Sequence, residues 1–228
     1  DAVMRTGPAY GEVMIGAPVT FGEPSKPLVP LARMARTPWQ LEVFVLHLPV
    51  TTVQAWEAGR KIWNFPKFVA DMHLDLGEHR SILTLSEGGR TILQMAVRRG
   101  GSLSVDNGNL VTYASKDGQM LRIDNPMGGV KSLRLGRGSA GIRLGSHEIA
   151  KQLRGLDLSD TGAAAVTYAR NHLLLNGPEP VGAARPYDGL LRAEEPERGR
   201  FVLAYPGTPP IDVCAVPPNE NVPVEPNG

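Results

Sequence analysis

Lys67 is the only charged residue within residues 63–69, a stretch that is otherwise aromatic, aliphatic, amide or proline. Loss of hydration disfavours an ammonium group, so burial among such neighbours favours the neutral amine. A neutral amine can attack a ketone and form an imine. The alternative is a lysine whose stem lies along apolar surface while its charged end stays in water. The stretch therefore predicts either a reactive amine or a surface lysine.

Three stretches of the chain resemble segments of the acetoacetate decarboxylase family. Residues 10–12 read Tyr-Gly-Glu and residues 18–21 read Pro-Val-Thr-Phe, which resembles the family's Tyr-x-Glu with a downstream Pro-Val-Ser/Thr-Phe. Residues 59–67 read Gly-Arg-Lys-Ile-Trp-Asn-Phe-Pro-Lys and are similar to the family's Gly-Arg-Glu run that ends in aromatic-Pro-Lys. Residues 144–150 resemble a late family segment. The resemblance covers about residues 10–175.

The resemblance implies a mainly β fold, a cone-like antiparallel β-barrel or double sheet with a few short helices. It implies that Lys67 forms a Schiff base with a small-molecule keto acid and that Glu12 is an acid/base or positioning carboxylate. It also implies a lyase without metal or organic cofactor, assembled as a homo-oligomer. The iminium accepts the electron pair released when carbon dioxide leaves or when an α-proton is removed.

Phe68 is the first departure from the family pattern. Family decarboxylases commonly carry a second lysine directly after the reactive one, and here that position is phenylalanine. A neighbouring cation would disfavour the charged amine, but successive strand residues point to opposite faces. Phe68 therefore argues against acetoacetate itself more than against imine chemistry.

The start of the chain is the second departure. Family members have a longer segment before the Tyr-x-Glu motif, and it supplies an arginine and a glutamate to the site. Either the sequence is trimmed or processed, or carboxylate recognition comes from elsewhere in the chain. We expect the substrate-binding residues to be Arg60, Phe65, Phe68 and Arg98, while a structural ion pair remains an alternative role for Arg60.

Three functions stay open. The first is a Schiff-base decarboxylase acting on a keto acid through Lys67. The second is a Schiff-base aldolase or dehydratase that uses the same imine on pyruvate-like keto acids. The third is a ligand-binding β-barrel without catalysis.

Short strands joined by turns are the elements that must position these residues. Gly and Pro account for 26 and 20 of 228 residues, which disfavours long helices. Short helices are predicted at residues 51–63 and 146–153, where Thr51 or Thr52 and Ser146 are capping candidates. Strands are predicted at residues 13–21, 41–48, 68–76, 81–85, 91–97, 110–114, 121–123 and 131–135. Turns are predicted at Gly77, 88–89, 100–101, 106–108 and 117–118.

The alternation after Pro66 raises a difficulty for Lys67. Every second residue from Phe68 to Leu76 is apolar, which places Lys67 on the opposite face with Asp71, His73 and Asp75. Periodicity alone therefore predicts an outward lysine. A barrel with a polar interior, or a bulge after Pro66, would reverse that expectation. Asp71, His73 and Asp75 are better explained as a solvated strand face than as metal ligands.

Composition excludes several classes of protein. Lys and Arg number 24 against 23 Asp and Glu, a net charge of +1, which argues against a mainly electrostatic nucleic-acid binder. No apolar run approaches the ~18 residues of a membrane-spanning helix, so we expect no membrane partner. A single cysteine excludes both an intramolecular disulfide and a cysteine metal cluster.

The chain divides by composition at about residue 177. Residues 1–177 are predicted to form the β-barrel domain, and residues 178–228 a Pro/Gly-rich C-terminal tail with at most an edge strand at residues 201–205. The lone cysteine favours a cytoplasmic location, while N-terminal processing stays open because residue 1 is aspartate.

Overall fold

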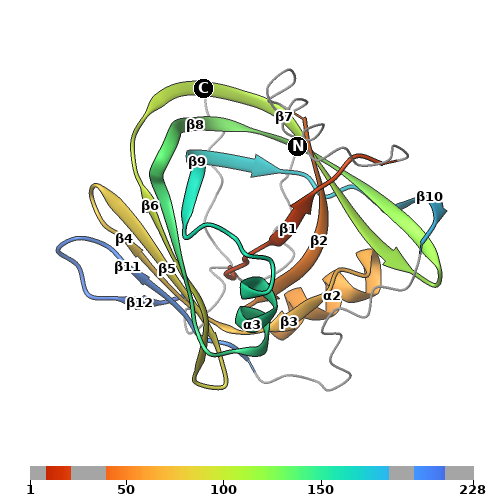
Figure 1. Ribbon diagram of the computed structural model, residues 1–228, viewed down its shortest axis with the longest axis horizontal. Helices are drawn as coiled ribbons and strands as arrows, with labels where there is room; N and C mark the ends of the chain where they lie inside the picture. The colour runs from red at the N-terminus through yellow and green to blue at the C-terminus, as the bar shows by residue number, and fades with distance from the viewer. Residues whose placement is uncertain (1–8, 22–39, 185–197, 214–228) are drawn as a thin grey trace, which may run out of the picture.

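A strongly curved β-sheet carries most of the chain in the computed structural model (Figure 1), which describes residues 9–21, 40–184 and 198–213. The prediction of a mainly β fold with a few short helices is confirmed. In chain order the elements are β1 (Ile15–Pro18), β2 (Gln40–Val50), α2 (Val53–Trp63), β3 (Lys67–Val69), β4 (Asp71–Leu76), β5 (Arg80–Glu87), β6 (Arg90–Arg98), β7 (Ser102–Lys116), β8 (Gln119–Leu144), α3 (Glu148–Arg154), β9 (Thr161–Leu173), β10 (Glu179–Ala183), β11 (Phe201–Ala204) and β12 (Ile211–Asp212).

The sheet is open and mixed, which differs from the expected antiparallel meander. Its path runs β1-β2-β7-β8-β6-β5-β4-β11-β12, while β3 pairs with β2, and β9 and β10 pair with β8. Among the described strands, β2 is parallel to both β3 and β7, and β11 is parallel to β4. Parallel neighbours need a crossover, and α2 supplies the one between β2 and β3. Turn signals in the sequence locate hairpins but not such crossovers.

Strand β8 gives the sheet its curvature. It pairs with β10 and β7 along its first part, and with β9 and β6 further on. Its register against β9 shifts between Leu135 and Ala140, where Gly136 and Gly138 have positive φ values of 95° and 83°. A glycine tolerates this conformation because it has no Cβ. The long strand therefore bends and serves several neighbours.

Helix α2 begins and ends at residues that suit those positions. The Thr52 hydroxyl accepts a hydrogen bond from the amide of Ala55 at 3.3 Å, an N-cap that confirms one of the two capping candidates. At the other end Asn64 adopts the left-handed conformation with φ 52°, and its amide donates to the carbonyls of Arg60 and Gly59. The chain then turns into β3.

Two apolar clusters form most of the core. One joins β3, β4, β5, β6 and α3 through buried side chains: Phe68, Ala70, Met72, Leu83, Leu85, Ile92, Leu93, Ile149 and Leu153. The other lies between β2, β7 and β8 and contains Val45, Leu48, Phe65, Ala114, Leu121 and Ile123. A smaller group of Val50, Ala55 and Val69 attaches α2 to β2 and β3. Each of the three clusters contains a neighbour of Lys67 in the chain, namely Phe68, Phe65 or Val69, so packing fixes the backbone on both sides of the lysine.

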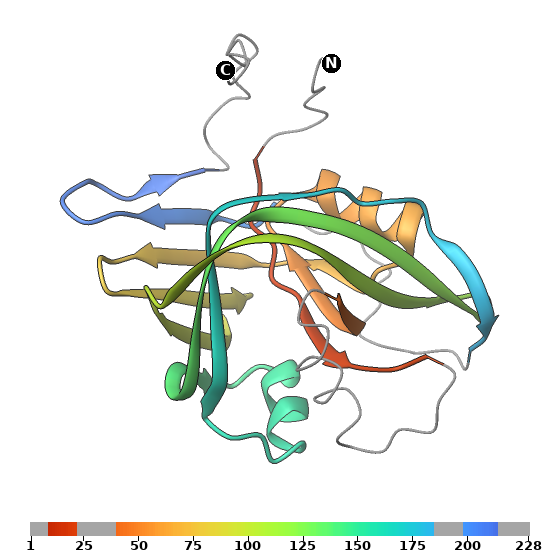
Figure 2. The ribbon, with the colours of Figure 1, turned by 90° about the horizontal axis from the view of Figure 1, so that it is seen from above.

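The described part of the C-terminal region adds strands to the same sheet. β10 pairs with β8, and β11 lies between β4 and β12, at the end of the molecule away from β10 (Figure 2). The predicted strand at residues 201–205 is therefore present, but it is flanked on both sides. Residues 185–197 and 214–228 of the predicted tail lie outside the described residues. No helix in the described ranges is long and apolar enough to cross a membrane.

Candidate active site

Lys67 opens β3 and is buried. Its side chain is 5% exposed, and the stem lies against Gly59 of α2, where a Cβ would stand 2.4 Å from both Cδ and Cε. The outward orientation that periodicity predicts is wrong, because β3 and β4 are separate strands interrupted at Ala70 and β3 is buried on both faces. The amide of Lys67 donates to the carbonyl of Phe65 at 2.7 Å in a tight turn at Pro66, which brings the start of β3 back against α2.

Glu12 meets the amine of Lys67. The Nζ atom donates to Glu12 Oε2 at 2.7 Å, so the structure brings together the two residues predicted to be catalytic. The Glu12 side chain is 37% exposed, in contrast to the lysine. The Tyr10 ring completes the surroundings, with its centroid 5.6 Å from Nζ. A charge-assisted hydrogen bond of this kind stabilises a lysine that has little contact with water.

The segment that carries Glu12 is fixed to the end of β2. The amide of Gly11 donates to the Thr51 hydroxyl at 2.9 Å, and the amide of Thr51 donates to the Gly11 carbonyl at 3.1 Å. The amide of Val13 bonds the Pro49 carbonyl at 3.1 Å, and Glu12 itself forms an isolated antiparallel bridge with Val50. β2 also pairs with β3, so one strand positions both the carboxylate and the amine.

Tyr10 stays a neutral phenol beside this ion pair. Burial, followed by the charge of Glu12 and a hydrogen bond to it, raises the pKa of Tyr10 to about 12. A phenol of this kind donates to the carboxylate and helps to orient it. The motif that identified Glu12 also contains Tyr10, but the sequence alone indicates no role for that residue.

Arg60 contacts the backbone of Lys67 rather than its amine. Its Nε donates to the carbonyl of Lys67 at 3.0 Å, and its guanidinium lies over the Trp56 ring, 5.2 Å from the centroid. Burial lowers the pKa of Arg60. These contacts give Arg60 a part in holding the backbone of β3. Its expected contact with a substrate carboxylate stays a prediction.

The structure shows other contacts for the three further residues predicted to bind substrate. Phe65 packs into the cluster between β2, β7 and β8 and stacks on Trp63 at 6.3 Å, while Phe68 packs into the cluster with Met72. Arg98 ends β6, exposed and opposite Arg80. Substrate contact by Phe65, Phe68 and Arg98 therefore stays a prediction.

A cavity of about 680 Å³ lies beside the ion pair, and Glu12 forms part of its wall while Lys67 lies behind Glu12, outside that wall. The charged residues in that wall are Glu12 and Arg99, one position beyond the predicted Arg98. Nothing in the sequence separates Arg98 from Arg99, because β6 ends there and the strand alternation no longer applies. The other wall residues are Gly11, Val13, Met72, Leu74, Leu76, Ser81, Leu83, Met95, Val97, Gly100, Leu103, Ser132, Val166, Thr167, Tyr168, Ala169 and Phe201.

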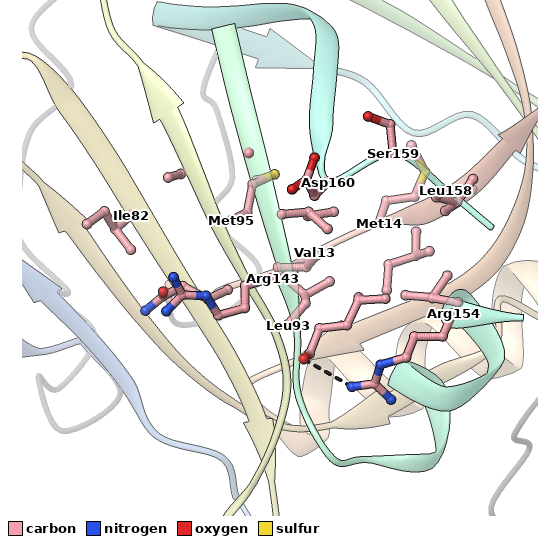
Figure 3. A pocket seen from close by; sticks show the side chains of 18 of the residues that line it. Val13, Met14, Ile82, Leu93, Met95, Arg143, Arg154, Leu158, Ser159 and Asp160 are labelled. Atoms are coloured by element: carbon pink, nitrogen blue, oxygen red, sulfur yellow. Dashed lines mark hydrogen bonds between the residues drawn. The ribbon is translucent and has the colours of Figure 1, made fainter. Parts of the chain in front are cut away.

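A second cavity of about 790 Å³ lies between β1, β6, β8 and α3 (Figure 3). It shares Val13 and Met95 with the first cavity. Arg154 at its rim donates to the Leu144 carbonyl at 3.1 Å, so this arginine is engaged in holding α3 against β8.

The described residues contain no group of three or more His, Cys, Asp or Glu side chains that could hold a metal ion. Within the strand face considered above, Asp71 accepts a hydrogen bond from the amide of Arg200 at 2.8 Å. That contact ties β4 to the segment before β11.

Comparisons with known proteins agree with this fold. The family model described as acetoacetate decarboxylase (ADC) matches residues 2–133. Acetoacetate decarboxylase from Legionella pneumophila is 15% identical, with a TM-score of 0.51 over 78% of this chain and 69% of that chain. An acetoacetate decarboxylase-like enzyme from Sphingomonas wittichii RW1 is 16% identical, with a TM-score of 0.47 over 77% and 70%. A search of the curated proteins finds no match.

Proposed function

Because this chain belongs to the acetoacetate decarboxylase family, we propose that it is a Schiff-base-forming lyase that acts on a keto acid through an imine on Lys67. The observation that carries the proposal is the buried amine of Lys67, 2.7 Å from the carboxylate of Glu12 at the wall of a cavity. A structural lysine needs neither the cavity nor the burial.

The first step requires a neutral amine and an acid. A proton moves from the Lys67 ammonium to Glu12 along their hydrogen bond, and the amine then attacks the keto carbon. Glu12 returns the proton to the hydroxyl of the resulting carbinolamine, which leaves as water. The product is an iminium cation on Lys67, with the carboxylate of Glu12 restored beside it.

The second step breaks a carbon–carbon bond. The β-carboxylate leaves as carbon dioxide, and the electron pair of that bond becomes the double bond of an enamine while the iminium nitrogen becomes neutral. A proton from water then adds to the enamine carbon, and a second water molecule hydrolyses the regenerated iminium to the ketone and the free amine. Tyr10 serves as a positioning residue for Glu12.

The aldolase or dehydratase reaction is the second candidate, and Phe68 favours it. The side chain at this position is buried in an apolar cluster, so no second cation occupies it. In this candidate the enamine formed from a pyruvate-like keto acid attacks an aldehyde instead of taking up a proton. The imine on Lys67 is common to both reactions.

Borohydride trapping tests the imine directly. We expect incubation with acetoacetate or pyruvate and borohydride to add the mass of the reduced imine, and peptide mapping to place it on Lys67. Lys67→Arg should abolish the adduct, while Lys61→Arg, an exposed position on α2, should keep it. Carbon dioxide from acetoacetate would support the decarboxylase, and a condensation product from pyruvate plus an aldehyde would support the aldolase. An unchanged mass, together with ligand binding by Lys67→Arg equal to that of wild type, would leave only a binding protein.

A further inference from the structure

The shape and lining of the cavity beside Glu12 bear on the substrate. We propose that this cavity binds an extended apolar substituent, so that the natural substrate is a keto acid with a medium-length alkyl or arylalkyl chain. This inference rests on the proposed function, because an imine on Lys67 would hold the keto carbon at the end of the cavity where Glu12 forms the wall. The cavity volume of about 680 Å³ falls within the ~300–1,000 Å³ of sites for drug-sized ligands, far more than a four-carbon acid fills.

The length of the cavity follows from strand β4, which runs along its wall from Met72 to Leu76. Met72 lies at the catalytic end, since a Cβ on Gly11 would stand 2.8 Å from its Sδ. Leu76 lies at the other end, next to Gly77, whose carbonyl accepts from Arg99 at 3.1 Å. Met72, Leu76 and Arg99 all line the cavity. Four residues at ~3.3 Å each give a span of about 13 Å, the length of an extended chain on the order of ten carbon atoms.

The wall along this span is mostly apolar. Leu74 and Leu83 are paired across β4 and β5, and Leu83 is paired with Met95 across β5 and β6, so neighbouring strands present aliphatic side chains side by side. The hydroxyls of Ser132 and Thr167 lie 2.7 Å apart and bond each other, which leaves them little demand for a polar ligand. A chain bound here would exchange water for hydrocarbon along most of its length.

The two charged wall residues mark the two ends. Glu12 stands at the amine, and Arg99 is held at the Gly77 carbonyl at the opposite end. A β-carboxylate lies only two bonds from the keto carbon, so it stays near Lys67 and cannot reach Arg99. The space between Glu12 and Arg99 therefore suits a hydrocarbon chain rather than the carboxylate of the keto acid.

Methyl ketones of increasing length test the inference. The experiment measures the concentration of acetone, 2-heptanone or 2-undecanone that gives half-maximal borohydride labelling of Lys67. Complete burial of one methylene improves affinity by about fourfold, so even partial burial should lower this concentration at least tenfold from acetone to 2-heptanone. Equal values for the three ketones, with Lys67 labelled by each, would overturn this inference alone. A failure of every ketone to label Lys67 would overturn the proposed function and this inference with it.

A variant that fills the far end of the cavity sharpens the test. Val97 is paired with Ser81, and both line the cavity near Leu76. Val97→Phe should raise the half-maximal concentration of 2-undecanone at least tenfold more than it raises that of acetone. His73→Phe, an exposed position on β4 outside the cavity wall, should change neither. If Val97→Phe fails to fold, Ser81→Leu supplies the same obstruction. Unchanged labelling by 2-undecanone in the folded variant would place the chain elsewhere and overturn the inference.

Discussion

The amine of Lys67 and the carboxylate of Glu12 form an ion pair whose members differ in depth. The lysine side chain is 5% exposed and the glutamate 37%. The buried ammonium depends on its partner more than the exposed carboxylate does. Water can solvate Glu12 if the ion pair breaks, but little water reaches Lys67. The half-exposed partner can thus move aside for a substrate while the amine stays in place.

Tyr10 reports on the charge of Glu12. Burial is the main cause of its pKa of about 12, and Glu12 adds to it through charge and a hydrogen bond. Glu12→Gln removes the negative charge that disfavours the phenolate, so the pKa of Tyr10 should fall. It should stay above 10 because the burial of the ring remains. The measurement is a tyrosinate absorbance titration of the folded protein, in which Tyr10→Phe identifies the transition.

Tyr113 supplies the matched control for that titration. Its pKa is also raised to about 12 by burial and by Glu42, whose carboxylate accepts from the phenol at 3.1 Å. Glu42→Gln should therefore shift Tyr113 and leave Tyr10 alone. A Glu12→Gln variant that moves neither tyrosine would show that Glu12 does not contact Tyr10 in solution.

The residues of the site differ in how well the sequence predicts them. Lys67 and Glu12 are 55 positions apart, and no local pattern links them. Only the family motifs point to both, and the structure then shows their contact. Arg99, next to the predicted Arg98, lines the cavity, and the sequence does not single it out because the choice between adjacent residues depends on where β6 leaves the sheet. Gly59 is part of a motif, but its role is visible only once α2 is packed on β3.

At the level of elements, helix α2 determines the place of Lys67. Gly59 faces β3, Arg60 holds the Lys67 carbonyl, and Asn64 turns the chain between them. The lysine stem occupies the space that a side chain on Gly59 would need. Helix–strand packing at Gly59 therefore leaves no room for a larger residue beside the lysine stem.

Gly59→Ala tests this packing. The new Cβ would meet Cδ and Cε of Lys67 at 2.4 Å, so we expect the amine to be displaced and the rate of borohydride labelling to fall at least tenfold. Overpacking costs about 1–3 kcal/mol, and the higher helix propensity of alanine offsets up to ~1 kcal/mol of it, so the free energy of unfolding should fall only modestly. Denaturant unfolding and labelling by intact mass measure the two effects.

Ala58→Gly is the control for helix stability. Ala58 is exposed on the same helix, and glycine there costs about 1 kcal/mol without approaching Lys67. Labelling should stay at the wild-type rate despite the lower stability. Equal loss of labelling in both variants would mean that helix stability, and not the space at Gly59, positions the amine.

The sequence predicts the hairpins better than the long strands. Gly88 and Gly89 have positive φ and form the turn between β5 and β6 where the sequence places it, and residues 117–118 do the same between β7 and β8. In contrast, the turn predicted at residues 106–108 lies inside β7, and the strands predicted at residues 121–123 and 131–135 are parts of β8. Glycine and asparagine favour a turn locally, but fifteen paired positions along β7 and β8 override that preference.

At the level of the whole molecule, the long strands β7, β8 and β9 carry apolar side chains that water contacts. Leu103, Val105 and Leu135 are each at least 70% exposed, and Val166 and Leu173 are also exposed. Scattered exposure of this kind is common, but a concentration on adjacent strands is typical of an interface. The chain has a net charge of +1, so two copies repel each other only weakly. The predicted homo-oligomer therefore has a candidate surface here.

Self-association through these strands is open to a direct test. Wild-type protein should sediment as an oligomer at micromolar concentration, because burial of this apolar surface contributes about 25 cal/mol per Å². In a symmetric dimer each substitution acts in both subunits, so Val105→Lys or Leu135→Lys should place charges in the contact and shift the equilibrium toward monomer. Gln54→Lys adds the same charge at an exposed position of α2, outside these strands, and should leave the oligomer intact. A wild-type chain that sediments as a monomer throughout would exclude these strands as a self-association surface and assign their apolar side chains to some other contact.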